Sequence, residues 1–271
     1  PLGLLAVFYY AVTVDTIILK NLSTRPKRLE KLFEEKGLIR ISEPRLEEMA
    51  GSILARLEPG NLEIFQQAKI GNIVISDTYL DIGKDRFTPE IAKIRMYLTV
   101  LSVDLSRSVP DLYFDSIRLD LKLVQWLIKP EQQDQLEADF YHHFKVYSPI
   151  GYHIDLRAIV SPDVMEVLIS LSKYDIQFAD NRLYIYDTMH LDEKRGILND
   201  IDKVSKLVML LERNLNTYRD SRVAGRVNRG VIHRDGYRLR LRKKYLIRTI
   251  LYFVLSTILY VGFFIVVTAV Q

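Results

Sequence analysis

The chain has 271 residues, of which 48% are hydrophobic and 27% charged, carries a formal net charge of +4 and contains no cysteine. This length allows one or two domains, and the apolar content excludes an intrinsically disordered chain. The lack of cysteine excludes a disulfide framework, a thiol nucleophile, a redox-active cysteine pair and thiolate metal sites.

The N-terminal segment, residues 1–19, is apolar but too short for a complete membrane span. Leu2 to Val14 carry no charge before Asp15 interrupts the run, whereas a span needs about 20 apolar residues. The segment is membrane-associated, the end of a truncated or processed span, or an apolar strand. The basic residues from Lys20 to Arg28 favour a cytoplasmic location for the chain that follows.

Two helices and a strand-rich region are predicted next. Pro26 begins the first helix and Gly37 ends it, a typical asymmetry of helix termini. Residues 42–57 have apolar positions at helical spacing and are predicted as the second helix. Between residues 61 and 82, short runs rich in β-branched and aromatic residues predict strands.

The middle of the chain predicts a mainly antiparallel sheet. Residues 93–105 and 112–121 are expected to form a hairpin around a turn at 106–111. Residues 174–178 and 183–186 give a second hairpin signal across the turn residues 179–182. The other elements predicted here are a helix at 131–144, a strand at 144–147 and a helix that begins at Ser161 and Pro162. We therefore predict an α+β fold in which a mainly antiparallel sheet packs with helices.

A long helix is predicted from Gly196 to about Tyr218. Its apolar residues recur at alternating spacings of three and four, over too few heptads to establish a coiled coil. This face packs on the sheet of the same domain, or it meets a protein partner or a second copy of the chain. The residues of this possible partner face are Ile201, Val204, Val208, Leu211 and Leu215.

The segment 219–248 is strongly basic. It holds eleven basic and two acidic residues, a net charge of +9 that leaves −5 for the rest of the chain. Gly225, Gly230 and Gly236 indicate a flexible juxtamembrane linker. Contact with anionic lipid headgroups is favoured over nucleic-acid binding because an apolar run follows directly. The predicted lipid contacts are Arg234, Arg238, Arg240, Arg242, Lys243, Lys244 and Arg248.

Residues 249–270 predict a transmembrane helix. These 22 residues carry no charge and would form a helix of about 33 Å, which matches a hydrocarbon core of about 30 Å. A basic segment on its N-terminal side is typical of the cytoplasmic side. We expect a single-pass or two-pass protein of the cell membrane, with a cytoplasmic domain at residues 20–218.

Residues of catalytic type are present but form no recognisable motif. His142 and His143 are adjacent in a predicted helix and point about 100° apart, so Asp139 and His142 give at most half of a metal site. Asp104 and Asp115 would have to meet in a cleft to act as acid and base. Glycine-rich nucleotide-binding motifs and the G-x-S-x-G motif are absent from the sequence. We predict no catalytic, cofactor-binding or metal-binding residues.

Residues 144–186 carry a family pattern. A strand is followed by a helix that begins Ser-Pro-x-Val-Met-x-x-Leu, then by Ile-x-Phe-x-x-Asn-x-Leu-Tyr-Ile. The stretch resembles the core of a bacterial family of membrane-associated proteins of unknown function, whose spans precede the domain and whose helix usually begins with Thr. The resemblance implies an α+β fold and membrane association, and it implies no activity. Ser161 replaces the usual Thr, and the matching residues are Pro162, Val164, Met165, Leu168, Ile176, Phe178, Asn181, Leu183, Tyr184 and Ile185.

These observations favour a membrane-anchored, non-enzymatic interaction or scaffold module. A module that uses the Arg-rich segment to bind lipid headgroups or nucleic acid is the second hypothesis. An enzyme that acts at the membrane surface, with a site the sequence does not locate, is the third. Salt-dependent binding that is lost on removal of residues 234–244 would favour the second, and a buried carboxylate pair with perturbed pKa values would favour the third.

Overall fold

The computed structural model describes residues 31, 33–57, 61–82, 94–118, 128–187, 196–219 and 237–241. The apolar N-terminal segment 1–19 and the predicted transmembrane helix 249–270 lie outside the described residues. In the part of the chain that the structure describes, no helix is both long and apolar enough to cross a membrane.

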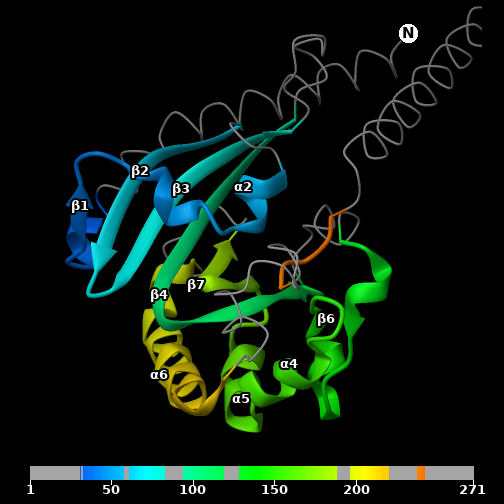
Figure 1. The fold of residues 1–271 in the computed structure, drawn as a ribbon. Helices are drawn as coiled ribbons and strands as arrows, with labels where there is room; N and C mark the ends of the chain where they lie inside the picture. The colour runs from blue at the N-terminus through cyan, green and yellow to red at the C-terminus, as the bar shows by residue number, and fades with distance from the viewer. Residues whose placement is uncertain are drawn as a thin grey trace, which may run out of the picture.

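The described residues form an α+β fold around one antiparallel sheet (Figure 1), which confirms the predicted fold class at this level. The strand order is β1-β2-β3-β4-β6-β5, and β7 pairs with β4. The strands are β1 (Ile39–Ile41), β2 (Leu62–Ile70), β3 (Ile73–Ile82), β4 (Ile94–Ser116), β5 (Gln133–Asp134), β6 (Phe144–Tyr147) and β7 (Asp175–Asp187).

The two hairpins predicted in the middle of the chain are wrong. Residues 94–116 form the single strand β4, and residues 175–187 form the single strand β7. The two strands pair with each other along their lengths, from Thr99 opposite Asp187 to Phe114 opposite Ile176. Figure 1 shows β4 bending sharply where the sequence predicts a turn.

Bulges explain the bend. The register between β4 and β7 shifts between Asp104 and Val109 and again between Val109 and Leu112. Pro110 lies in this region, where its missing N–H removes no ladder hydrogen bond. Opposite Val109, Asp180 of β7 has a φ of +56°. A bulge inserts an unpaired residue and bends the strand, so turn-forming residues here bend two strands without reversing either.

Among the described residues, the helices are short except for α6. The α-helices are α2 (Ile53–Leu57), α4 (His153–Ile159), α5 (Pro162–Ser170) and α6 (Ile201–Thr217). The 3-10 helices are Leu46–Met49, Pro130–Gln132, Ala138–His142 and Ile197–Asn199. The starts of α5 and α6 agree with the sequence prediction within a few residues. The predicted helix at 131–144 is wrong, because two 3-10 helices flank β5 there, and the predicted helix at 42–57 is interrupted before Ile53.

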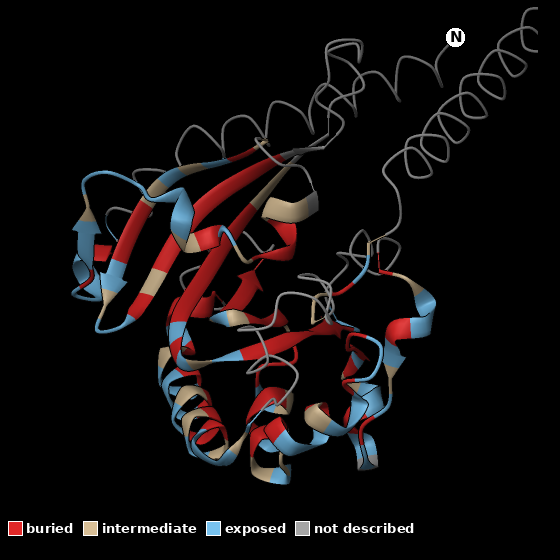
Figure 2. Ribbon diagram, in the orientation of Figure 1, coloured by how far each residue is buried: buried red, intermediate tan, exposed pale blue. Residues whose placement is uncertain are grey.

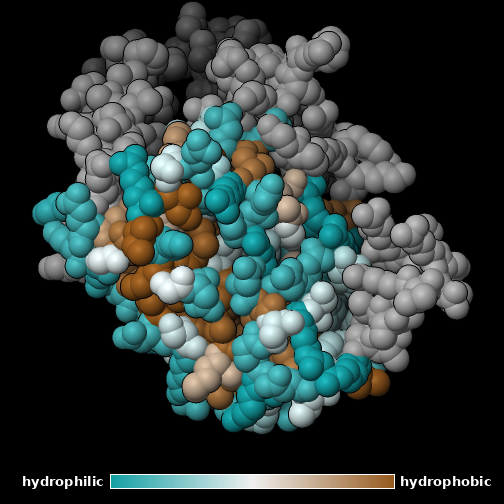
Figure 3. Space-filling model, turned by 60° about the vertical axis from the view of Figure 1, so that its left-hand side comes forward, coloured by the Kyte–Doolittle hydropathy of each residue, from teal (hydrophilic) through white to brown (hydrophobic). Residues whose placement is uncertain are grey.

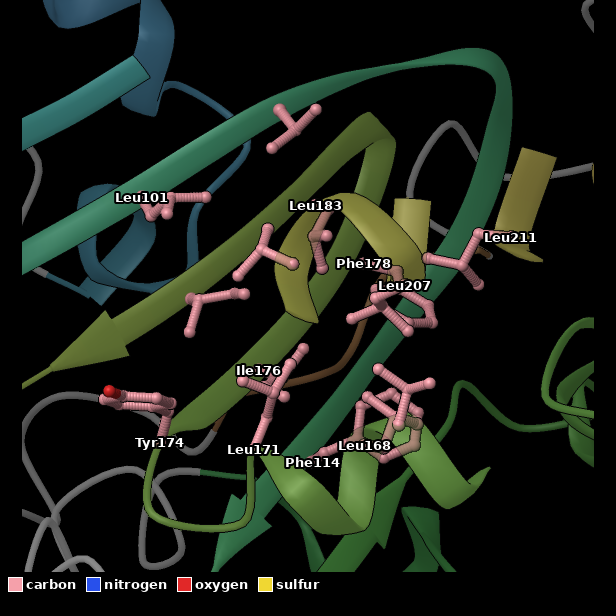
Figure 4. Close-up of a cluster of buried hydrophobic side chains, with 14 of the residues drawn as sticks. Leu101, Phe114, Leu168, Leu171, Tyr174, Ile176, Phe178, Leu183, Leu207 and Leu211 are labelled. Atoms are coloured by element: carbon pink, nitrogen blue, oxygen red, sulfur yellow. The ribbon is translucent and has the colours of Figure 1, made fainter. Parts of the chain in front are cut away.

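Buried residues run along the strands of the sheet (Figure 2), and their side chains form two hydrophobic cores. The larger core lies between one face and the helices α4, α5 and α6, with Leu101, Leu183 and Leu211 among its members (Figure 4). A second core on the opposite face lies against α2 and includes Tyr186 and Leu239. Because neighbouring strand residues point to opposite faces, Ile185 and Tyr186 belong to different cores.

The predicted partner face of α6 is part of the larger core. Val204, Leu211 and Leu215 are fully buried, and Ile201 and Val208 are partly buried against the same cluster. The proposal that this face meets a partner is therefore corrected: the sheet of the same domain occupies it. On the other side of α6, Met209 is 62% exposed.

Candidate functional site

The basic segment contains a short stretch, Tyr237–Leu241, that is docked on the folded domain; we call it the strap. Its backbone is held on both sides of Leu239. The Asp111 N–H donates to the carbonyl of Tyr237 at 2.9 Å, and the Leu239 N–H donates to Asp111 Oδ2 at 3.1 Å. Asp111 therefore binds the strap with both its backbone and its side chain.

Gln132 binds the next residue of the strap in the same reciprocal way. The Arg240 N–H donates to Gln132 Oε1 at 2.7 Å, and Gln132 Nε2 donates to the Arg240 carbonyl at 2.9 Å. Ile128 and Leu241 add one antiparallel bridge. The Gln132 amide thus satisfies both backbone groups of Arg240. Together with the antiparallel bridge, this means that the strap binds the domain as an extended peptide.

Side chains of the strap add an apolar and a charged contact. Leu239 is 3% exposed and belongs to the second core. Asp180 accepts a hydrogen bond from the Tyr237 hydroxyl at 2.8 Å, and Arg238 Nη2 lies 3.1 Å from Asp180 Oδ2. The positive φ that bends β7 at Asp180 thus places this carboxylate beside the strap.

Asp111 connects the strap to distant parts of the fold. Its buried carboxylate forms an ion pair with the partly buried Arg56 of α2 and accepts a hydrogen bond from Gln177 Nε2 at 2.7 Å. Gln177 Oε1 accepts hydrogen bonds from the Ile53 N–H at 2.8 Å and from the Tyr186 hydroxyl at 2.5 Å. A buried carboxylate with several charge-assisted partners is costly to disturb. The strap, α2, β4 and β7 therefore share one polar network.

The predicted lipid-contact residues have different outcomes. Arg238 is half-buried against Asp180, whereas the side chain of Arg240 is exposed. The prediction of a flexible linker over all of 219–248 is corrected for residues 237–241, because backbone hydrogen bonds and a buried leucine attach them to the domain. The remaining predicted contacts lie outside the described residues: Arg234, Arg242, Lys243, Lys244 and Arg248.

A second polar feature is a pair of carboxyl groups where β4, β6 and β7 meet. Asp115 of β4 lies opposite Lys145 of β6. On the other side of β4, Tyr113 pairs with Gln177 and Phe114 pairs with Ile176 of β7. Continued by one residue, this register places Asp115 opposite Asp175. Asp115 is 6% exposed and Asp175 is fully buried. Residues directly opposite in neighbouring strands have Cβ atoms about 4.5–5.5 Å apart, so two acids share a dry environment.

Burial raises the pKa of both acids, and repulsion by Asp115 adds to the effect at Asp175. Burial is the larger cause at Asp175 and proximity to Asp115 adds to it, which raises the pKa of Asp175 to about 8. The pKa of Asp115 is raised to about 6 by burial, against the opposing charge of Lys145. The Tyr113 hydroxyl and the Ser116 N–H each donate to Asp175 at 2.7 Å. One carboxyl of the pair therefore keeps a proton near neutral pH.

The carboxylate pair considered from the sequence, Asp104 with Asp115, is not the pair that the structure forms. Asp104 lies on the other side of the bend in β4 and pairs with Arg182 at 2.6 Å. The pair involves Asp175 instead, which sequence reasoning missed together with Asp111, Gln132 and Asp180. The available signal was the charged and polar residues Asp175 and Gln177 in an otherwise apolar strand, since buried polar side chains require partners.

No metal site is evident in the described part of the chain. The described residues hold no group of three or more His, Asp or Glu side chains placed to bind a metal ion. His142 ends the 3-10 helix Ala138–His142 and His143 follows it. The prediction of adjacent histidines in an α-helix is therefore replaced by a tighter turn.

Comparison with protein-family models, with curated proteins and with solved structures finds no match for the chain. The resemblance of residues 144–186 to a bacterial membrane-associated family stays a prediction.

Proposed function

We propose that the chain is a membrane-anchored, non-enzymatic interaction module. Its α+β domain faces the cytoplasm, and residues 249–270 anchor it in the cell membrane. The observation that carries the proposal is the strap, because a segment bound to the domain ends only seven residues, 242–248, before the uncharged run.

The strap would hold the domain close to the bilayer. Seven residues reach at most about 25 Å when fully extended, whereas a connection that left the domain at Arg219 would include 29 residues. Arg242, Lys243, Lys244 and Arg248 fall within the short connection, where each contributes about 1 kcal/mol to binding of an anionic lipid surface. The domain is thereby kept at the membrane surface with a limited range of orientations.

A protein partner would meet an exposed apolar surface. Figure 3 shows hydrophobic side chains gathered on the side of the molecule that carries β1, β2 and α6. Ile39 of β1 is 64% exposed and Met209 of α6 is 62% exposed. Exposed apolar side chains that gather on one side of a molecule are typical of interaction sites.

The first experiment tests anchoring and orientation in cells. Since the chain has no cysteine, Lys206→Cys on the exposed side of α6 and Gln271→Cys each introduce one thiol. Both variants are fractionated with the membranes and treated, in intact and lysed cells, with a membrane-impermeant maleimide. We expect the full chain to stay in the membrane after alkaline extraction, and only the Gln271→Cys variant to label in intact cells.

Two outcomes contradict parts of the proposal. Release of the chain by alkaline extraction would overturn the anchor. Labelling of Lys206→Cys in intact cells, alone or together with Gln271→Cys, would overturn the cytoplasmic orientation. A matched chain that lacks residues 249–270 is expected to leave the membrane fraction, which shows that this run carries the anchoring.

A further inference from the structure

The paired carboxyls Asp115 and Asp175 are physically connected to the strap. Tyr113 connects the pair to the residues that pack near the strap. Its hydroxyl donates to Asp175 at 2.7 Å, and its ring centroid lies 6.3 Å from that of Tyr186. Tyr113, Tyr186 and Leu239 belong to the same buried cluster. A shift of Tyr113 therefore changes the packing around Leu239, because such cores have few voids in which to absorb it.

A polar connection runs in parallel. The Tyr186 hydroxyl donates to Gln177, Gln177 donates to Asp111, and Asp111 accepts the Leu239 N–H. This hydrogen-bond network runs from the strap to Tyr186, and the ring contact between Tyr186 and Tyr113 completes the connection to Asp175. Both linkages pass through β4 and β7, the strands that carry the two acids.

We propose that Asp115 and Asp175 form a proton-binding site whose occupancy controls how firmly the strap is held. With a proton bound, the pair carries one charge and β4 and β7 keep their register beneath Leu239. When the proton leaves, two negative charges face each other across neighbouring strands, the arrangement that destabilises strand pairs. Lys145 on β6 offsets part of the charge on Asp115, whereas Asp175 has only the neutral donors Tyr113 and Ser116 among its hydrogen-bond partners in the described residues.

The direction of the effect follows from proton linkage. The pKa values of Asp115 and Asp175 are raised to about 6 and about 8 in the folded domain, so the closed form binds protons more tightly than an open, hydrated form. Closure of the strap then takes up protons, and opening becomes more favourable as the pH rises through this range. One coupled proton changes the opening equilibrium by up to about tenfold per pH unit.

The inference rests on the proposed function for its consequence at the membrane, where release of the strap would lengthen the connection from residues 242–248 to residues 220–248. Its chemistry does not depend on anchoring. The test uses the full chain in detergent micelles and introduces Leu239→Cys, the single thiol of the protein. The rate of reaction of this buried thiol with a disulfide reagent reports opening of the strap.

The reaction rate is measured between about pH 6 and about pH 8 in three backgrounds. Asp175→Asn is neutral at every pH and still offers an acceptor to Ser116. Asp115→Asn removes the repulsion and loses no hydrogen bond that the described residues make. Asp202→Asn, an exposed acid on α6, is the matched control. Dividing by the rate of the unfolded chain at each pH removes the titration of the thiol itself.

We expect the normalised rate to rise with pH in the Leu239→Cys chain and in its Asp202→Asn derivative. The rise should flatten with Asp115→Asn and disappear with Asp175→Asn. Equal pH dependence in all four proteins would overturn the proposal. If Leu239→Cys opens the strap by itself, hydrogen exchange of the Leu239 and Arg240 amides in the cysteine-free chain gives the same comparison. Release of the chain from the membrane by alkaline extraction, together with an intact pH dependence of the normalised rate, would overturn the proposed function alone.

Discussion

At the scale of single residues, Asp111 is the position on which the strap depends most. Its fully buried carboxylate pairs with Arg56 and accepts hydrogen bonds from Gln177 and Leu239. Loss of one partner of a buried ion pair leaves the other charge uncompensated. The effect of an Asp111 substitution on stability therefore depends on whether Arg56 is present.

Asp111→Ala is expected to lower the free energy of unfolding by about 3 kcal/mol, because it leaves the largely buried Arg56 side chain, 16% exposed, without a counter-charge. Urea unfolding followed by circular dichroism measures the change. The double variant Asp111→Ala with Arg56→Met should recover part of the loss, since both charges are then absent. A double variant no more stable than Asp111→Ala would contradict this account of the ion pair.

Asp200 predicts a pH dependence opposite in sign to that of the Asp115–Asp175 pair. Burial acts to raise its pKa, but hydrogen bonds from Lys173, Lys203 and Tyr174 outweigh burial and lower it below the usual value. A depressed pKa gives stability that is present above the pKa of the unfolded chain and lost as the pH falls through the folded value. Asp200→Asn should therefore destabilise the protein at neutral pH.

Urea midpoints of the wild-type chain and of Asp200→Asn, compared between about pH 7 and about pH 3, test this expectation. The two midpoints are expected to converge as Asp200 becomes protonated in the wild type. A difference that stays constant over the whole range would show that the ionised carboxylate is not the stabilising form.

At the scale of elements, the sequence predicts strand content better than strand connection. Residues 94–105 and 112–116 are strands as predicted, but Ser106–Asp111 bends β4 where we expected a reversal. A proline with polar neighbours is compatible with both outcomes, and only the pairing of Val109 with Asp180 decides between them. That pairing joins residues 71 positions apart, a long-range contact that local turn signals do not contain.

The helices that the sequence predicts correctly are those specified by local signals, and the wrongly predicted helix at 131–144 is overridden by long-range contacts. The start of α5 has Pro162 at its first position, and α6 has a regular apolar face, so local signals suffice for both. Residues 131–144 contain good helix formers, yet Gln132 is used to bind Arg240 and Gln133 pairs with Tyr147. Tertiary contacts override propensity there. The strap escaped prediction for the same reason, because its partners lie more than 50 residues away.

Helix α6 offers a matched pair of substitutions. Leu211 is fully buried in the larger core and Met209 is 62% exposed. Leu211→Ala should lower the free energy of unfolding by about 2–5 kcal/mol through lost burial and a cavity. Met209→Ala should change it by less than about 0.5 kcal/mol. A large effect of Met209→Ala on association with a partner, without an effect on unfolding, would identify that side of α6 as an interaction surface.

At the scale of the whole molecule, the strap changes where the domain ends. The sequence predicts a domain of residues 20–218 followed by a linker, but Leu239 is buried in the second core and Gln132 binds Arg240. The folded unit therefore includes residues 237–241. This placement brings Arg238 to Asp180 at 3.1 Å, so cohesion between the strap and the rest of the domain has an electrostatic as well as an apolar component.

Two shortened chains measure the contribution of the strap to the domain. A chain that ends after Lys244 keeps the strap, and a chain that ends after Tyr218 lacks it; neither contains residues 249–270. The longer chain should be more stable by roughly 2–4 kcal/mol, because it buries Leu239 and satisfies Asp111 and Gln132. Leu239→Asp in the longer chain is the matched control and should reproduce most of the loss. If both chains unfold at the same urea concentration, the strap is not an integral part of the domain, and the domain would then be joined to the anchor by the full length of residues 219–248.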